Sequence, residues 1–521
     1  MNPDQSQMDS CSRSLQISLF ATGCSGIVAE FVLSTLAAYL LGNAVFQWTI
    51  VMSFMLFSMG LGSRVSRNFS FHLLDFFILT EFTLSILCAV SSAVAFGVAA
   101  YTEARSLIIY GLSLVIGFLI GMEIPLATRI NSRYQGLRTN ISSILEMDYF
   151  GSLLGGLVFA FVLLPFLGLA YTPIVLGSIN FSVAAWLFFK FKHLIVLKKT
   201  IYSVFLSVFA ALIVLSLGVE PIVRYGEQKK YKDRIIFARQ TEFQRIVITQ
   251  WKQWYWLYIN GDEQFSTYDE ERYHEPQVHP AMKIAGSCSK VLILGGGDGL
   301  AAREVLKYSE VRQITLVDID PVITDLALNH PILSMANHGA MADKRVQVHN
   351  MDASAFLEMD DNLYNVIIVD LPDPDSVDLM HLYSLGFYMD LKTRLARGGV
   401  MVTQATSPFF ARNAFLCINK TMQAAGFSTL PYHNQVPTLG QWGWIIGVNH
   451  KDASSGLLKK TASHLEFKDI TTRFINNSAM ISMIHFGKGL FDSEVSDHIK
   501  VNRQSDPVLL NYYTRGSWGI Y

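Results

Sequence analysis

The sequence predicts three consecutive parts: a multi-span α-helical membrane domain, a small β-domain and a doubly wound α/β domain. Three observations support this division. Long apolar runs dominate the chain up to residue 217, segments with strand-like alternation follow, and short apolar strands separated by helices occupy the remainder. We place the three parts at residues 1–220, 221–285 and 286–521.

Seven apolar runs are candidates for membrane-spanning helices, each of which needs about 20 mainly apolar residues. They cover residues 15–41, 46–61, 73–101, 107–122, 150–169, 173–191 and 201–217. The first run is too long, and follows too few basic residues, to be a cleaved signal peptide. Gly151, Gly155 and Gly156 are small enough to let two such helices approach closely. We therefore expect a multi-pass protein of the inner cell membrane.

Two arguments about the orientation of these helices conflict. Basic residues gather after the second, fourth and sixth runs, at Arg64, Arg67, Arg129, Arg133, Arg138, Lys190, Lys192, Lys198 and Lys199. The positive-inside rule places these loops in the cytoplasm, so seven spans would put the α/β domain on the outer side. The chemistry inferred for that domain requires it in the cytoplasm, which is the location we expect. Either one run does not span the membrane, or the charge rule fails for this protein.

Charge and cysteine usage exclude two classes of partner. The net charge of −1 gives no basic field that would attract nucleic acid. The five cysteines are scattered without a CxxC spacing, which predicts reduced thiols and neither a zinc site nor a disulfide framework. His274 and His279 are five residues apart, but no third ligand follows at a useful spacing, so we expect no metal.

The stretch VLILGGGDGLAAREVLKYSEVRQITLVDID, residues 291–320, predicts a nucleoside-binding turn. A buried strand over 291–294 runs into glycines, of which Gly295 and Gly297 allow a tight turn and a close ligand approach. Asp318 ends the next strand, where a carboxylate can accept hydrogen bonds from ribose hydroxyls. Asp298 inside the turn would repel a pyrophosphate at the helix N-terminus. The turn therefore favours a nucleoside with a cationic tail, such as S-adenosylmethionine and its relatives.

More acids follow predicted strands in the α/β part. Asp352 comes after the strand near residue 346, where it could bind an adenine amino group or cap the next helix. Further strands are predicted near residues 366, 399 and 444. Since ligands of doubly wound sheets bind at the carboxyl ends of the strands, Asp298, Asp318, Asp352 and Asp370 would share one edge. This edge predicts a cationic ligand.

The segment DLPDP, residues 370–374, holds two carboxylates on a stiff loop. Asp370 follows an apolar strand directly, and Asp373 lies between two prolines. Such a loop restricts two acids to a fixed geometry, which suits catalysis. The plainer alternative is a rigid turn whose aspartates cap a neighbouring segment.

Several motifs together resemble the spermidine synthase (polyamine aminopropyltransferase) family, in its membrane-integral form. They are LYINGDEQFSTYDEERYHEPQVHPAM, VLILGGGDG, VDID, MDA, DLPDP, LYSLGFY and the closing VNRQSDPVLLNYY. The resemblance covers about residue 234 to the C-terminus. It implies a Rossmann-like, methyltransferase-like domain that moves the aminopropyl group of decarboxylated S-adenosylmethionine to an amine, usually putrescine, giving spermidine and methylthioadenosine. It implies no further cofactor, and family members are commonly homodimers.

The resemblance also implies roles for residues of the nucleoside edge. Asp298 would bind the amino end of the donor, Asp318 its ribose and Asp352 its adenine. Gln244 in EFQRI and Gln264 in GDEQF match positions that touch the nucleoside or the donor.

On the acceptor side, Tyr273 matches a tyrosine beside the attacking amine, and we assign the adjacent His274 to the same substrate site. The amine must be neutral and aligned to attack, whereas the sulfonium leaves without a general acid. Because an alkylammonium has a pKa near 10, a carboxylate must bind it and take a proton. We expect Asp370 to be this base and Asp373 to orient the diamine.

One departure leaves the acceptor open. Where putrescine-using members carry PTY, this chain has VPTLGQWGW, with Leu439 at the position of the tyrosine. Trp442 or Trp444 could replace it. Two other functions remain possible on the same motifs: a methyltransferase that uses S-adenosylmethionine, and a membrane protein that binds or transports polyamines without turnover.

Three acids, Glu30, Glu81 and Glu123, lie within or at the ends of the apolar runs. Carboxylates inside a membrane are costly and usually functional. A cation path or a polyamine-binding cavity is one interpretation. In the other, the acids lie near the interfaces or pair with neighbouring Ser, Thr or Arg side chains.

Overall fold

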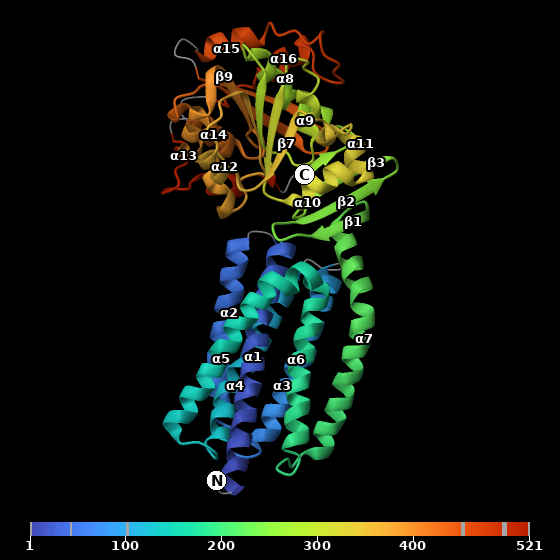
Figure 1. The fold of residues 1–521 in the computed structure, drawn as a ribbon, viewed down its shortest axis with the longest axis vertical. Helices are drawn as coiled ribbons and strands as arrows, with labels where there is room; N and C mark the ends of the chain where they lie inside the picture. The colour runs from blue at the N-terminus through green and yellow to red at the C-terminus, as the bar shows by residue number, and fades with distance from the viewer. Residues whose placement is uncertain (1–2, 42–43, 100–103, 450–453, 492–497, 519–521) are drawn as a thin grey trace. The chain divides into compact units, whose positions relative to one another are not determined.

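The computed structural model describes residues 3–41, 44–99, 104–449, 454–491 and 498–518 (Figure 1). Its contacts divide the chain into two units, Met1–Arg234 and Ile235–Tyr521. The first unit ends later than residue 220, where we had placed the boundary. The reason is that its last helix continues past its apolar part to Lys230 without a break.

The first unit is a bundle of helices. Among the described residues its helices are α1 (Pro3–Leu41), α2 (Ala44–Ser66), α3 (Leu73–Ala99), α4 (Arg105–Asn131), α5 (Leu137–Val158), the π-helical η1 (Phe159–Leu167), α6 (Gly168–Lys190) and α7 (Lys198–Lys230). Most of these helices extend beyond the predicted apolar runs at one or both ends, because polar residues continue the helix outside the hydrocarbon. The predicted end of the third run, Tyr101, lies outside the described residues.

Six helices in the described part of the chain are long and apolar enough to cross a membrane, whereas we predicted seven runs. The difference arises because residues 137–190 form one helical stretch of 54 residues. A straight helix of that length would measure about 80 Å, far more than the roughly 30 Å of a bilayer core. Figure 1 shows that the stretch turns back at η1, so that α5 and α6 run in opposite directions. The predicted run 150–169 covers the second half of α5, all of η1 and the first two residues of α6, whereas the predicted run 173–191 lies in α6 except for its last residue.

Glycines bring α1 and α5 into close contact. A Cβ atom at Gly151 would lie 2.0 Å from the carbonyl oxygen of Phe20, and one at Gly155 would lie 2.5 Å from that of Cys24. Any larger residue would push the two backbones apart. The predicted role of these two glycines in helix packing is confirmed, while Gly156 only approaches a Phe31 ring.

The second unit begins with a four-stranded sheet in the order β1-β2-β3-β4. Its strands are β1 (Arg234–Gln240), β2 (Arg245–Trp251), β3 (Trp254–Ile259) and β4 (Asp262–Ser266). Ile246, Ile248 and Leu257 of this sheet are buried against Ile323 and Leu326 of helix α10 (Pro321–Asn329). The predicted β-segment is thus packed onto the α/β part as one unit. Helix α8 (Glu271–Ile284) follows it.

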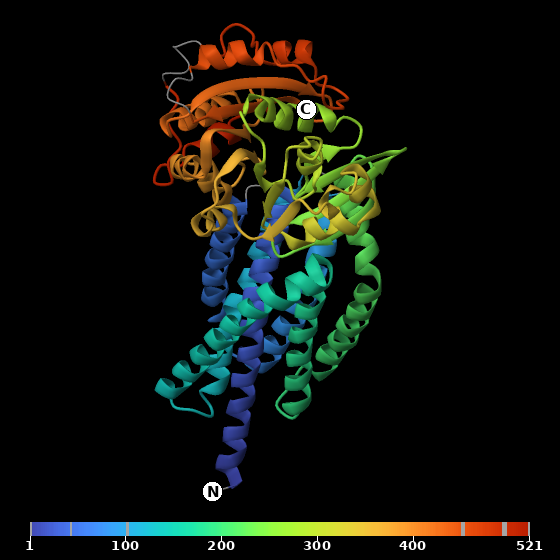
Figure 2. The ribbon, with the colours of Figure 1, turned by 45° about the horizontal axis from the view of Figure 1, so that its top comes forward.

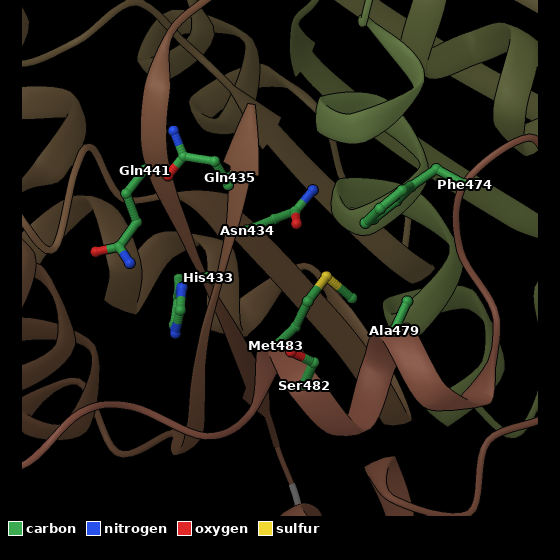
Figure 3. Close-up of a pocket in the computed structure, with 8 residues that line it drawn as sticks. All are labelled: His433, Asn434, Gln435, Gln441, Phe474, Ala479, Ser482 and Met483. Carbon is green, nitrogen blue, oxygen red and sulfur yellow. The ribbon is translucent and has the colours of Figure 1, made fainter. Parts of the chain in front are cut away.

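The rest of the unit is a seven-stranded sheet in the order β10-β11-β9-β8-β5-β6-β7 (Figure 2). Its strands are β5 (Lys290–Gly295), β6 (Gln313–Asp318), β7 (Val346–Asn350), β8 (Tyr364–Asp370), β9 (Leu395–Gln404), β10 (Ser428–Val436) and β11 (Gly440–Val448). All six predicted strands are present. We missed β10, because Pro431 and the polar run that follows it mask its alternation.

Helices cover both faces of this sheet, as expected for a doubly wound, Rossmann-like fold. The described helices are α9 (Leu300–Val305), α10 (Pro321–Asn329), α11 (Pro331–Ala336), η2 (Ala340–Ala342), α12 (Ala353–Met359), η3 (Val377–Tyr383), α13 (Leu385–Thr393), α14 (Arg412–Ala424), α15 (Ser455–Ala462), α16 (Asn477–Met483) and α18 (Leu509–Thr514). Parallel pairing of β6, β5, β8 and β9 aligns their carboxyl ends at one edge. That edge carries the predicted site.

Candidate active site

The glycine turn and Asp370 lie side by side because β5 and β8 are parallel neighbours. Gly295 pairs in register with Asp370. Gly295 has φ +79°, and a Cβ atom there would lie 2.0 Å from the carbonyl oxygen of Asp370. A Cβ atom at Gly297 would lie 2.5 Å from a carboxylate oxygen of Asp318. Both positions therefore require glycine. The sequence predicted a tight turn here, but not that the backbone of Asp370 and the side chain of Asp318 occupy the space of a Cβ atom.

Asp318 is held at the end of β6 by two backbone donors. The N–H of Gly297 donates to it at 3.0 Å and the N–H of Asp320 at 2.9 Å. Burial nevertheless raises its pKa to about 6. Asp298 accepts a hydrogen bond from the N–H of Leu300 at 2.8 Å, and burial raises its pKa to about 6 although His274 works in the opposite direction. A cation bound between these groups would favour their ionised forms.

Asp352 caps α12, the alternative that the sequence analysis left open. Its Oδ1 accepts a hydrogen bond from the N–H of Ala355 at 2.9 Å. Its other oxygen lies 3.8 Å from Nε2 of His381 and is partly exposed. One oxygen is therefore structural, and the second is free to meet a ligand.

Two substitutions of Asp352 separate these roles. Asparagine is as good an N-cap as aspartate, whereas alanine costs about 1 kcal/mol of folding free energy. We expect Asp352→Asn to keep its thermal midpoint but to raise the donor KM about tenfold, since the free acceptor oxygen is lost. Asp352→Ala should show both effects. A normal donor KM in Asp352→Asn would restrict Asp352 to capping.

Asp370 receives two hydrogen bonds from α8. The hydroxyl of Tyr273 donates to its Oδ1 at 3.0 Å, and Nε2 of Gln277 donates to the same oxygen at 2.8 Å. Burial, together with the charge of Asp370, raises the pKa of Tyr273, so its phenol stays protonated and remains a donor. Gln277 is fully buried, and its own carbonyl oxygen has no partner among the described residues. Sequence reasoning missed Gln277.

Asp373 is held by a different set of donors. Nε2 of Gln404 lies 3.0 Å from one oxygen and Oγ1 of Thr406 lies 3.2 Å from the other, and Tyr513 of α18 also donates to it. Burial raises the pKa of Asp373 to about 7 despite these donors. Gln404 and Thr406 were not predicted. Tyr513 belongs to a motif that carried the resemblance, but nothing in that motif indicated that it reaches the site.

His274 is buried against Glu270 rather than exposed to a substrate. Its Nδ1 lies 2.9 Å from the carbonyl oxygen of Glu270 and 3.2 Å from its carboxylate, which Arg303 holds with two hydrogen bonds. Burial acts to lower the pKa of His274, but Glu270 outweighs it and raises the pKa. The imidazolium then lies within electrostatic range of Asp298 and Asp370. A substrate contact for His274 remains a prediction.

The two predicted glutamines are not joined to the carboxylates. In the described ranges, the amide of Gln264 donates to the carbonyl of Asp262 at 3.2 Å, and Gln244 is anchored by its backbone to Thr241. Neither side chain contacts Asp298, Asp318, Asp352 or Asp370 in these parts of the chain. Their contacts with a donor stay predictions.

One cluster has the composition of a metal site: Glu275, His279 and Glu304. Its ligand atoms are already used within the protein. Glu275 accepts hydrogen bonds from three successive backbone N–H groups, beginning at Arg473. His279 contacts Glu304 at 2.8 Å through Nε2 and Tyr308 at 3.1 Å through Nδ1. The cluster joins α8 to the C-terminal region and to α9.

Comparison with known proteins agrees with this geometry. Residues 270–459 match the family model for the spermine/spermidine synthase domain. The chain is 41% identical over 507 residues to polyamine aminopropyltransferase 2 of Aquifex aeolicus, covering 97% of this chain and 99% of the relative. It is 37% identical to the polyamine aminopropyltransferase of Oceanobacillus iheyensis, covering 95% and 96%. It is 36% identical to that of Leptospira interrogans, covering 96% and 98%.

These matches run through the membrane unit as well as the α/β unit, so the whole architecture is shared. The glycine turn, the strand-end carboxylates and α8 lie within or next to the matched domain. The chain belongs to the polyamine aminopropyltransferase family, as an enzyme with an N-terminal unit of helices able to cross a membrane.

Proposed function

We propose that this enzyme transfers the aminopropyl group of decarboxylated S-adenosylmethionine to a diamine such as putrescine, giving spermidine and methylthioadenosine. One observation carries the proposal: Asp370 is fixed by Tyr273 and Gln277 at the end of β8, beside the glycine turn. A nucleoside on the turn and an amine at Asp370 would then be neighbours. No metal or further cofactor takes part.

In the reaction, the amine nitrogen forms a bond to the donor carbon while the carbon–sulfur bond breaks. The electron pair of that bond returns to the sulfonium, which leaves as a neutral thioether. The proton of the attacking ammonium goes to Asp370, because only the free amine has a lone pair. Tyr273 and Gln277 both donate to one oxygen of Asp370, which fixes the direction of the other.

The donor is held by the glycine side of the site. Asp318 would accept hydrogen bonds from the ribose, Asp352 from the adenine, and Asp298 would bind the ammonium end of the aminopropyl group. Burial raises the pKa of Asp298, because it destabilises the ionised carboxylate. A bound cation stabilises that ionised form, whereas a neutral group does not. A carboxylate at the same place would be repelled.

The acceptor is held between α8 and the first half of β11. The ring of Tyr273 lies 5.4 Å from that of Trp444 and 6.3 Å from that of Trp442. The buried indole nitrogen of Trp442 has no partner among the described residues, and the same holds for the carbonyl oxygen of Gln277. A diamine can satisfy the latter through an N–H group. Leu439, which stands where putrescine-using members of the family carry the tyrosine of PTY, packs on the core and offers no hydroxyl.

The pH dependence of amine use tests the role of Asp373. Its pKa is raised to about 7, so it is ionised above that pH and neutral below it. Because only the carboxylate attracts an ammonium, kcat/KM for the amine should fall about tenfold per pH unit below roughly pH 7. Asp373→Asn should lower kcat/KM, and the fall of kcat/KM that begins near pH 7 should disappear. The fall that begins near pH 6, where Asp298 and Asp318 become protonated, should remain. If kcat/KM of the variant still fell below about pH 7, Asp373 would not be the group responsible.

We place the catalytic unit in the cytoplasm of a cell whose inner membrane holds the helices, since a charged nucleoside donor does not cross a bilayer freely. The basic residues named above favour the opposite orientation. Their loops lie at the end of the bundle where α1 begins, away from the end of α7 (Figure 1). Fusion of alkaline phosphatase or a fluorescent protein to the C-terminus decides between the two. Phosphatase activity would contradict a cytoplasmic location.

An assay with the purified, full-length protein tests the proposed reaction. Decarboxylated S-adenosylmethionine with a labelled aminopropyl group is offered together with putrescine or longer amines, and S-adenosylmethionine is offered in parallel. We expect labelled spermidine and one methylthioadenosine for each transfer. Methyl transfer from S-adenosylmethionine, or saturable binding without any product, would overturn the proposal. A homodimer, which the resemblance implies, is checked by light scattering on the same preparation.

A further inference from the structure

The membrane unit contains carboxylates that the proposed reaction does not use. Glu123 of α4 is buried, and it lies next to Thr22 of α1, whose hydroxyl donates to the carbonyl oxygen of Leu19 at 3.3 Å. Asp148 of α5 lies within electrostatic range of Glu123. It is less buried than Glu123 and presses against Gly23 of α1, where a Cβ atom would lie 2.8 Å from its carboxylate oxygen. Glu123 and Asp148 thus form an acidic pair on one side of α1.

A separate observation concerns Glu81 of α3. Its side chain is fully buried, and neither carboxylate oxygen has a hydrogen-bond partner among the described residues. Glu81 interacts electrostatically with Glu123, so it faces the acidic pair. An ionised carboxylate without any partner is among the most costly groups to bury in a membrane protein. Glu81 is therefore compatible with the fold only when it carries a proton or meets a cation.

Among the described residues, no Lys, Arg or His side chain forms a salt bridge with these acids. Helices α4, α6 and α7 pack against α3, and α1 approaches it as well. Between residues 14 and 29 of α1, 168 and 189 of α6, and 200 and 219 of α7 the sequence holds no charged residue. Cys88 also lies within electrostatic range of Glu81 and Glu123. Arg129, further along α4, donates instead to the carbonyls of Pro125, Phe69 and Ser66.

We propose that Glu81, Glu123 and Asp148 form a proton-binding site inside the helix bundle, with Glu81 as the residue that holds the proton. Asp148 is half-buried, whereas Glu123 and Glu81 are 3% and 0% exposed, so Glu81 is the innermost of the three acids. A proton, unlike a larger cation, needs no cavity between the helices. A Cβ atom at Gly23 would already lie 2.5 Å from the carbonyl oxygen of Asp148, so the helices leave little room at that point. The site goes beyond the proposed aminopropyl transfer and does not rest on it.

Labelling with dicyclohexylcarbodiimide tests this site in the full-length protein reconstituted in lipid. The reagent is apolar and couples to protonated carboxyls within membranes, and mass spectrometry of peptides identifies the modified residue. We expect an adduct on Glu81 that decreases as the pH rises. Glu123→Gln should move the half-loss of labelling to lower pH, because removal of a neighbouring negative charge makes Glu81 easier to ionise.

Controls keep the result separate from folding and from catalysis. Glu30→Gln, which changes a buried acid outside the proposed site, in α1, should leave the adduct on Glu81 unchanged. Asp370→Asn should also keep it, even though turnover is lost, so failure of the reaction proposal leaves this test intact. Absence of the adduct at every pH overturns the proposal. Saturable protection of Glu81 by NaCl or by putrescine at constant pH overturns the proton assignment in favour of that cation.

Discussion

Asp370→Asn is expected to lower kcat by about 10²- to 10⁴-fold, the range that a positioned general base contributes. The substitution keeps the shape of the side chain and an oxygen that can accept from Tyr273 and Gln277, which lie 3.0 and 2.8 Å away in the wild type. What it removes is the ability to take a proton. Donor binding should change little, since the groups assigned to the nucleoside lie on β6, β7 and the glycine turn.

Single-turnover kinetics measure this effect free of product release, and calorimetry with methylthioadenosine measures the nucleoside site alone. The matched control is Asp361→Asn, because Asp361 is fully exposed and, in the part of the chain that the structure describes, pairs with Arg394 alone. Its rate should equal that of the wild type. If Asp370→Asn loses nucleoside binding together with turnover, Asp370 is a structural residue of the β8 turn and not the base.

Asp298→Asn is expected to alter the choice of donor. A hydrogen bond to a charged partner contributes about 1.5–3 kcal/mol, so loss of the carboxylate should raise the KM for decarboxylated S-adenosylmethionine by about 10- to 150-fold. The same change removes the repulsion that excludes the carboxylate of S-adenosylmethionine. The preference for decarboxylated S-adenosylmethionine over S-adenosylmethionine should therefore decrease. S-adenosylmethionine should inhibit the variant better than it inhibits the wild type.

Inhibition by S-adenosylmethionine, measured against the decarboxylated donor, gives this ratio directly. Asp325→Asn serves as the control, since Asp325 is exposed on α10 and bonds only to Asn329 among the described residues. Unchanged discrimination in Asp298→Asn would show that selectivity arises elsewhere in the site.

The sequence predicted the positions of the glycine turn and of the strand-end carboxylates because the information for them is local, whereas their contacts with a nucleoside stay predictions. Gly295, Gly297, Asp298 and Asp318 lie within about 25 residues of one another, in a pattern of strand, turn and helix that fixes their relation. The strands near residues 291 and 366 contain continuous apolar runs, which is typical of buried parallel strands, and the strand near residue 314 is interrupted only by Thr315. Their shared edge follows from the fold class alone.

The acceptor side was harder to predict because it is assembled from distant segments. Gln277 comes from α8, Gln404 from the end of β9 and Tyr513 from α18, and their meeting depends on packing that no short motif encodes. His274 was placed with the substrate from its neighbour Tyr273. However, successive residues on a helix point in different directions, and the structure directs His274 to Glu270. The helix ends of the membrane unit were missed for a different reason: apolar runs mark the hydrocarbon, whereas helices continue beyond it.

A structure of the full-length enzyme with methylthioadenosine and spermidine bound tests the central assignment most directly. We predict that a nitrogen of spermidine lies about 2.6–3.2 Å from the carboxylate of Asp370, as a general base requires. The nucleoside should lie on the glycine turn with its ribose at Asp318. A nucleoside bound elsewhere, or an Asp370 that faces away from every amine nitrogen, would contradict the account.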